Sequence, residues 1–212
     1  MRLVSFKRIR FKLVRNFLSE NEIDNILKIV KSENPDSILS KLSKSLFKKY
    51  IMLLVVSKNI KLYLCYIQNK IIGYAIFAIQ PRYLFEDFKI IRYKILFYLL
   101  ITFKILSILN LISSFLKIDL LLGNFYKKIV SKSCNLHLLA IENNYQMQGI
   151  GFKFLRFCIK NIKLKLVNNK YLFCETISSK AENFYIKKLG FQKVGKKKRI
   201  FQKNFSILVK RI

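Results

Sequence analysis

Hydrophobic and polar positions divide the first part of this chain into segments that predict strands. Apolar and basic side chains alternate over Arg10–Arg15, which is expected to form the first strand. Two longer runs, Lys61–Gln68 and Ile71–Ile79, are separated only by Asn69 and Lys70. Because so brief a polar segment between two strand-like runs favours a tight turn, these runs predict a hairpin.

Two helices are predicted between the first strand and the hairpin. Ser19 and Glu22 have the spacing of a capping box, and apolar residues at helical intervals follow them. The segment around Pro35 is expected to end this helix. A second helix is then predicted from about Ser37 to Tyr50, where apolar residues again fall on one face.

The last third of the chain predicts strands and a helix in alternation. An apolar run, Leu136–Ile141, and a strongly apolar helical pattern, Phe152–Ile162, flank a short turn. A strand is expected over Tyr171–Ile177, and two late strands over Phe191–Gly195 and Phe201–Val209.

Residues 81–132 interrupt this order with an insertion far longer than a hairpin loop. Its segment Ile90–Leu116 is strongly apolar, but polar residues recur in it as a narrow stripe. That stripe favours one or two amphipathic helices packed on the domain or on a second copy of the chain, as in a homodimer. Peripheral membrane contact through residues 90–117 is the second interpretation, and a membrane-spanning helix ranks well below both.

Composition limits the class of protein. The 212 residues suffice for one domain with a substantial core and are few for two, so a single domain over residues 1–212 is expected. The formal net charge of +30 favours acidic partners, including an acyl carrier protein. A lysine-rich coding bias explains the charge equally well, and both interpretations stay open. The basic run Lys196–Arg199 is interpreted as a solvated turn between two late strands, and contact with an acidic acceptor is the alternative. No nucleic-acid-binding motif occurs, so no nucleic acid partner is expected.

The four cysteines occur in apolar contexts without C-x-x-C spacing, which predicts reduced, buried thiols in a cytoplasmic protein. No metal site is expected, because the chain has one histidine and no close cysteine pair. Residues 1–18 lack a continuous apolar core and do not form a secretory signal. A cytoplasmic location is therefore expected, with the inner face of the membrane as the alternative if the insertion contacts lipid.

The most informative segment is Gln146–Gly151, which lies between the apolar run and the helical pattern. Its two glycines let the backbone approach a ligand closely. The first amides of a helix have no internal partners, and the helix dipole favours an anion there. The spacing fits neither G-x-G-x-x-G nor G-x-x-x-x-G-K-[ST]. The segment predicts a phosphate or pyrophosphate site, and a purely structural turn is the alternative.

Two segments together carry a resemblance to a known family. Leu138–Ile141 followed by Gln146–Gly151 resembles the acyl-CoA-binding motif [QR]-x-x-G-x-[GA] of the GCN5-related N-acetyltransferase (GNAT) superfamily. Downstream, Ala181–Phe191 is similar to the family signature that begins A-x-x-F-Y and ends G-F. The resemblance implies an α/β (α+β) fold. That fold has a mixed, strongly twisted sheet, helices on both faces and here a helical insertion between the third and fourth strands.

The resemblance also implies that acetyl-CoA is the co-substrate. In the family, backbone groups of the turn bind the pyrophosphate, and the preceding strand binds the pantetheine arm. Met147 and Gln148 stand where the family more often has Gly and Lys, and Ser178 where it often has Asn. The residues implicated in binding are Leu139, Ala140, Ile141, Gln146, Met147, Gln148, Gly149, Ile150, Gly151, Ser178 and Ala181.

Two residues are candidates for proton transfer. Tyr185 occupies the family position of a general acid, and a phenol can protonate a departing thiolate. The family's strand glutamate is replaced by Asn135, but His137 points to the same face two residues later and is the candidate base. For Tyr185 the alternative is an aromatic pair with Phe184 that covers the core, and Phe184 itself is expected in the core. For His137 the alternatives are a hydrogen-bonded core histidine, a water chain to Glu142, or an acceptor that arrives deprotonated.

The predicted function is transfer of an acetyl group from acetyl-CoA to a primary amine, directly and without an acyl-enzyme. The net charge favours an acidic acceptor such as a nucleotide-linked amino sugar, and the long apolar insertion favours work on surface polysaccharide or lipid-linked substrates. Acetylation of a ribosomal protein or another protein N-terminus is the enzymatic alternative. A basic interaction module that keeps the fold without turnover is the other.

Overall fold

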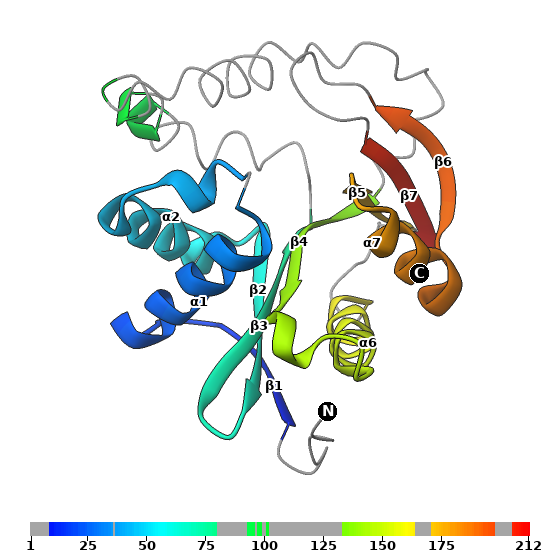
Figure 1. The fold of residues 1–212 in the computed structure, drawn as a ribbon, viewed down its shortest axis with the longest axis horizontal. Helices are drawn as coiled ribbons and strands as arrows, with labels where there is room; N and C mark the ends of the chain where they lie inside the picture. Colours follow the sequence, from blue (N-terminus) through cyan, green and yellow to red (C-terminus); the bar gives the residue numbers. More distant parts are fainter. Residues whose placement is uncertain are drawn as a thin grey trace. The chain divides into compact units, whose positions relative to one another are not determined.

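The computed structural model describes residues 9–35, 37–79, 93–95, 97–98, 101, 133–163, 171–197 and 205–212. The chain divides into two compact units, residues 1–79 with 137–167 and residues 80–136 with 168–212. Hydrogen bonding orders the strands β1-β2-β3-β4-β5-β7-β6 in one sheet (Figure 1). The pairs are both parallel and antiparallel, which confirms the predicted mixed sheet. A single domain over residues 1–212 stays a prediction.

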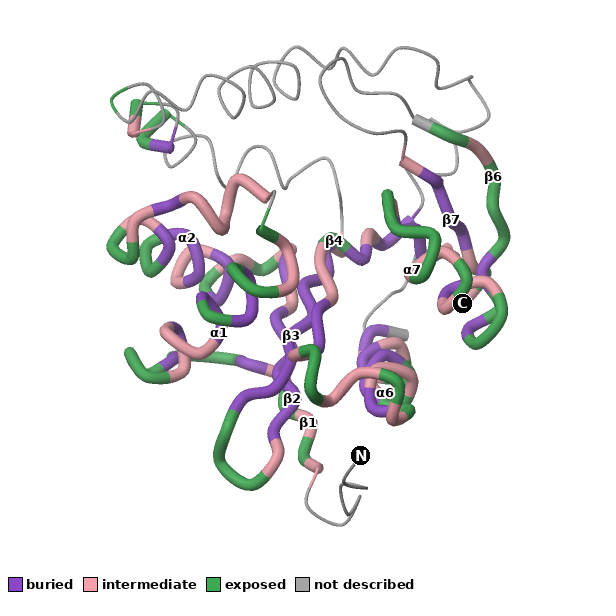
Figure 2. The backbone as a smooth tube through the Cα atoms, viewed as in Figure 1, coloured by how far each residue is buried: buried purple, intermediate pink, exposed green. Residues whose placement is uncertain are grey.

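The first unit is built on three antiparallel strands, β1 (Ile9–Leu13), β2 (Ile60–Ile67) and β3 (Lys70–Ala78). The predicted hairpin is confirmed, with Gln68 in the left-handed conformation at its turn. Every residue of β3 after Lys70 is buried, so this strand is covered on both faces (Figure 2).

Helices cover opposite faces of these strands (Figure 1). On one face, the Tyr66 hydroxyl of β2 donates a 2.7 Å hydrogen bond to Glu22 of helix α1 (Glu20–Glu33). On the other, the Phe11 ring of β1 lies 5.3 Å from the Phe154 ring of helix α6 (Ile150–Lys163). The predicted pattern of helices on both faces is therefore present in this unit.

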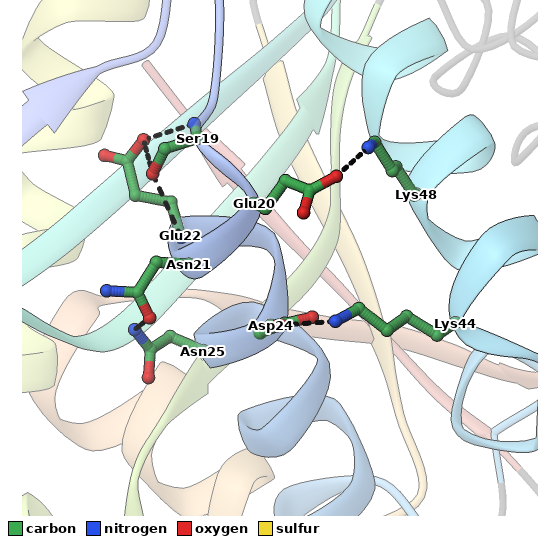
Figure 3. A network of polar contacts seen from close by, with 8 residues as sticks. All are labelled: Ser19, Glu20, Asn21, Glu22, Asp24, Asn25, Lys44 and Lys48. Carbon is green, nitrogen blue, oxygen red and sulfur yellow. Dashed lines mark hydrogen bonds and ion pairs between the residues drawn. The ribbon is translucent and has the colours of Figure 1, made fainter.

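Helix α1 begins with the predicted capping box (Figure 3). The Glu22 amide donates to Ser19 Oγ at 3.2 Å, and the Ser19 amide donates to Glu22 Oε2 at 2.9 Å. Burial works to raise the pKa of Glu22, but the hydrogen bonds from Tyr66 and Ser19 outweigh it and lower the pKa overall. A capping pair of this kind stabilises a helix by about 1 kcal/mol.

The second helix is displaced from the predicted range. Helix α2 spans Lys44–Val56, and the segment before it contains only a short 3₁₀ turn, Leu39–Lys41. Ser43 provides the N-cap by accepting from the Leu46 amide at 3.3 Å. Two ion pairs join α2 to α1, Lys44 with Asp24 at 2.7 Å and Lys48 with Glu20 (Figure 3).

The second unit contains the remaining strand pairs. Strand β5 (Tyr171–Thr176) pairs in parallel with Ser133–Leu136, the first half of β4 (Ser133–Ile141). It pairs antiparallel with β7 (Phe205–Arg211), and β7 pairs with β6 (Gln192–Lys197). Lys196 and Lys197 therefore lie within β6 and not in the predicted turn, while Lys198 and Arg199 lie outside the described residues.

Most of the predicted insertion, residues 81–132, lies outside the described residues. Its described residues are helical, and the Tyr93, Phe97 and Ile101 side chains are exposed. In the part of the chain that the structure describes, no helix is both long and apolar enough to cross a membrane.

Candidate functional site

The candidate donor site begins where β4 leaves its pairing with β5. Within the described residues, the parallel register between these strands ends at Leu136 and Cys174, although β4 continues to Ile141. Leu139, Ala140 and Ile141, the residues implicated in pantetheine binding, lie in this last part of the strand. A strand end without a β5 partner has backbone amides and carbonyls available to an extended ligand.

The same strand end is held against β3 by a close backbone approach. A Cβ on Gly73 would lie 2.8 Å from the Ala140 carbonyl oxygen and 2.4 Å from Ile141 Cδ1. The Glu142 amide donates a 2.8 Å hydrogen bond to the Ile72 carbonyl directly after β4 ends. Only glycine at position 73 permits this approach, which fixes the position of Ala140 and Ile141.

The predicted phosphate turn is formed by two left-handed residues at the start of α6. Met147 has φ +60° and Gly149 has φ +75°, and the helix begins at Ile150. The Gly149 carbonyl accepts from the Lys153 amide at 3.1 Å, so Gly149 is the N-cap residue. A Cβ at Gly149 would meet no atom within 4 Å, and Met147 is 80% exposed. The open space and the unpartnered helix amides suit a bound anion.

Sequence reasoning missed two residues that fasten the approach to this turn, Glu33 at the end of α1 and Lys70 at the start of β3. Glu33 accepts from the Asn143 amide at 3.0 Å and from Gln146 Nε2 at 2.8 Å. Lys70 pairs with Glu142 at 2.9 Å and lies over the Tyr145 ring. The sequence contained one indication of a role for Glu33, because a carboxylate at the C-terminus of a helix interacts unfavourably with the helix dipole.

His137 lies on β4 one residue beyond the last pair with β5, and it is exposed. It belongs to the same compact unit as the donor turn. This exposure contradicts the alternative of a core histidine. It suits contact with a substrate, although the role of base stays a prediction.

Tyr185 belongs to the second unit, where helix α7 (Ser179–Asn183) widens into a π-helical turn, Phe184–Lys188. Wide turns of this kind occur frequently at functional sites. The Tyr185 ring is buried, 5.4 Å from Phe184 and 5.3 Å from Phe191. Phe184 itself is only partly buried, so its assignment to the core was wrong. Burial raises the pKa of the Tyr185 phenol well above its ordinary value, so the phenol keeps its proton at neutral pH.

The remaining predicted contacts of this segment have structural roles in the described chain. Ser178 caps α7, because its hydroxyl accepts from the Ala181 amide at 3.3 Å. Glu182 ties α7 to the strands, accepting from Lys193 at 2.6 Å and from the Ser206 hydroxyl at 2.5 Å. Gly190 ends the segment in the left-handed conformation, with φ +69°. Contact of Ser178 or Ala181 with a ligand stays a prediction.

The four cysteines are buried and free, as predicted. Burial raises the pKa of Cys65 and of Cys134 to about 12 and also raises the pKa of Cys158 and Cys174. Because the thiolate is the nucleophile, none of these buried thiols is suited to form an acyl-enzyme.

Comparisons by sequence give no relative. No protein-family model matches the chain, and no curated protein matches it either.

Comparisons by structure give many similar proteins. A Salmonella typhimurium acetyl transferase that modifies the N-terminal serine of a 50S ribosomal subunit protein is 14% identical. It has a TM-score of 0.60 over 97% of this chain and 95% of its own. A GNAT family acetyltransferase from Elizabethkingia anophelis, solved with acetyl-CoA bound, is 16% identical with a TM-score of 0.53, over 97% and 99% of the two chains.

A ribosomal-protein-alanine N-acetyltransferase from Brucella melitensis is 10% identical, with a TM-score of 0.56 over 96% of this chain and 99% of its own. These matches cover nearly the whole of this chain and nearly the whole of each neighbour. They include the first two thirds of this chain, where the sequence contains no clear family motif. The protein therefore has the fold of the GCN5-related N-acetyltransferases.

Proposed function

We propose that this protein is an N-acetyltransferase that moves an acetyl group from acetyl-CoA to a primary amine. The observation that supports it best is the continuous segment from His137 to Gly151. This segment combines a strand end beyond the β5 pairing, a left-handed turn and the start of α6. Its space at Gly149 and its helix-start amides fit a pyrophosphate, and the strand end fits an extended pantetheine arm.

In this proposal the donor is held mainly by backbone groups. The amides of Gln148, Gly149, Ile150 and Gly151 donate to the pyrophosphate, while Leu139–Ile141 pair with the pantetheine arm. Side chains at positions 147 and 148 then matter little, which accounts for Met147 and Gln148 in place of the family's more usual Gly and Lys. Fixing the thioester next to the amine makes the reaction effectively unimolecular.

The chemical step is a direct transfer. The amine nitrogen attacks the thioester carbonyl, the N–C bond forms, and the C–S bond breaks. His137 takes the proton that the amine loses, since a neutral imidazole is a suitable base near pH 7. Tyr185 gives its proton to the departing thiolate. The phenol carries this proton at neutral pH, since burial raises its pKa.

For the acceptor we propose a nucleotide-linked amino sugar, supported by the net charge of +30. A protein amine is the second candidate. It is favoured by the ribosomal-protein acetyltransferases from Salmonella typhimurium and Brucella melitensis among the structural neighbours. Incubation with radiolabelled acetyl-CoA and either a set of nucleotide-linked amino sugars or ribosomal proteins separates the two, because label transfers only to the true acceptor class.

The proposal is tested by separating donor binding from turnover. Tyr185→Phe is expected to bind acetyl-CoA like the wild type in a calorimetric titration, because the ring remains. It should lose roughly 10²- to 10⁴-fold in kcat, the usual contribution of a positioned acid. Gly149→Glu is expected to abolish binding, since it places a carboxylate and a side chain at the left-handed turn position.

Tyr63→Phe is the matched control, because Tyr63 is a buried tyrosine of β2 that packs on Phe77 and is not part of the proposed chemistry. Its kcat should stay within about twofold of the wild type. No binding of acetyl-CoA to the wild type would overturn the proposal. Binding without transfer to any amine would favour the inactive interaction module.

A further inference from the structure

Glu33 joins two parts of the first unit that are far apart in sequence. Its carboxylate lies at the last residue of α1, and its two oxygens accept from two donors near the donor turn. Oε1 accepts from the Asn143 backbone amide at 3.0 Å, and Oε2 accepts from Gln146 Nε2 at 2.8 Å. A third contact, from Ser32 Oγ at 3.2 Å, comes from its own helix.

Gln146 completes the link to β4. Its Nε2 also donates to the carbonyl of Ile141, the last residue of β4, at 2.8 Å. A side-chain amide carries two N–H groups, and here one is directed to Glu33 and the other to the strand. The segment from Ile141 to Gln146 is therefore tied at both ends, immediately before the left-handed residues Met147 and Gly149.

Apart from these hydrogen bonds, the position of Glu33 is unfavourable for a carboxylate. The C-terminal end of a helix carries a partial negative charge, and a carboxylate near a phosphate site repels the ligand. Only 11 acidic residues occur in the chain, against 41 basic ones. Among the described residues, the hydrogen bonds that offset this unfavourable position come from the approach to the turn and from the adjacent Ser32, which indicates a role for Glu33 in that approach.

We propose that Glu33 is a positioning residue for the donor site. It holds residues 141–146 in the conformation that presents the amides of Gln148–Gly151 to the phosphates of acetyl-CoA. The inference rests on the proposed function for the identity of the ligand. The inference also explains why the first position of the acyl-CoA-binding motif, which is Gln146 here, has a hydrogen-bond donor in its side chain. That side chain must donate to both the Ile141 carbonyl and Glu33.

The test uses a side-chain swap. Glu33→Gln replaces one acceptor oxygen by a donor and should weaken acetyl-CoA binding roughly tenfold, because one of the two contacts is lost. Gln146→Glu sets a carboxylate against Glu33 and should weaken binding more. In the double variant Glu33→Gln/Gln146→Glu, the new amide can donate to the new carboxylate and still accept from Asn143. Its net charge equals that of the wild type, but a glutamate at position 146 cannot donate to the Ile141 carbonyl. Its affinity should therefore recover severalfold over Gln146→Glu alone and remain below that of the wild type.

Glu22→Gln is the control, because Glu22 is another α1 carboxylate that accepts from Ser19 and Tyr66 and does not touch the turn. Its affinity should stay within about twofold of the wild type. Three results would each overturn the inference. The first is unchanged acetyl-CoA affinity in Glu33→Gln, and the second is an equal loss of affinity in Glu33→Gln and Glu22→Gln. The third is no recovery of affinity in the double variant relative to Gln146→Glu.

A measurement without ligand separates this inference from the proposed function. In the free protein, the Asn143 amide of Glu33→Gln is expected to exchange with deuterium at least about tenfold faster than in the wild type, since its acceptor is weakened. Exchange at the Ser19 cap should not change. If Asn143 exchange is equally slow in both proteins, Glu33 does not hold the segment, whether or not acetyl-CoA binds.

Discussion

At the scale of the residue, the donor turn contains a side chain in a conformation that favours glycine. Met147 has φ +60° and is 80% exposed, so its side chain has little packing that could offset the strain. A left-handed backbone costs an L-residue about 1–2 kcal/mol. Strain of this kind is common at ligand sites, where the surrounding structure fixes the backbone.

This strain predicts an inverted order of stability at position 147. Met147→Gly is expected to be more stable than Met147→Ala by about 1 kcal/mol, because glycine adopts positive φ without a Cβ clash. Chemical denaturation of the two variants measures the difference. At Lys160, an exposed position within α6, the order should be the usual one, with Ala more stable than Gly by about 1 kcal/mol. The same order at both positions would show that Met147 is unstrained.

At the scale of the element, the position of β4 depends on the missing side chain of Gly73. The Cβ of an alanine there would overlap the Ala140 carbonyl oxygen and the Ile141 side chain, so the end of β4 would have to move. These two residues are the proposed contacts for the pantetheine arm. A packing change in β3 is therefore expected to affect the donor site without touching it.

Gly73→Ala is expected to lower the free energy of unfolding by about 1–3 kcal/mol, the usual cost of overpacking, and also to weaken acetyl-CoA binding. Thermal unfolding and calorimetric titration measure the two effects. Gly195→Ala in β6 is the matched control, because a Cβ there meets no atom within 4 Å, and both quantities should stay unchanged. A Gly73→Ala variant with normal stability would show that β3 and β4 can separate at no cost.

At the scale of the whole molecule, the few carboxylates serve as links between elements. Glu20 and Asp24 join α1 to α2, Glu22 joins α1 to β2, and Glu182 joins α7 to β6 and β7. The Lys48 contact lowers the pKa of Glu20, and the Lys193 contact lowers that of Glu182. In so basic a chain, each carboxylate also reduces repulsion among the cations.

Acid is therefore expected to destabilise the protein through these groups. A carboxylate whose pKa is lower in the folded state contributes stability above its unfolded pKa, near 4.5, and loses it as the pH falls through the folded pKa. Glu182→Gln should thus be less stable than the wild type at pH 7, and the two should converge as the pH falls below about 4. Urea titrations across this range measure the convergence. A constant difference at all pH values would show that Glu182 acts by packing alone.

The sequence by itself determined the elements whose signals are local. The capping box at Ser19, the β2–β3 hairpin and the glycine turn before α6 each depend on residues a few positions apart, so pattern and spacing predicted them. The start of α2 was missed because serines at positions 37 and 43 both have the spacing of a cap. Ser37 accepts from the Ser40 amide in the short 3₁₀ segment, and Ser43 caps α2. Of the candidate site, Leu139–Ile141 and Gln146–Gly151 could be proposed from the sequence because they are nearly continuous in the chain, and their contact with a donor stays a prediction.

Only the tertiary structure decided what depends on residues distant in sequence. The contact of Glu33 with Asn143 and Gln146 spans more than a hundred positions, and no local pattern encodes it. The need for glycine at position 73 arises from Ala140 and Ile141 of β4, more than sixty residues later in the chain. Short sequence motifs predict the chemistry of the site. The geometry of the site depends on which distant side chains the fold packs against those motifs.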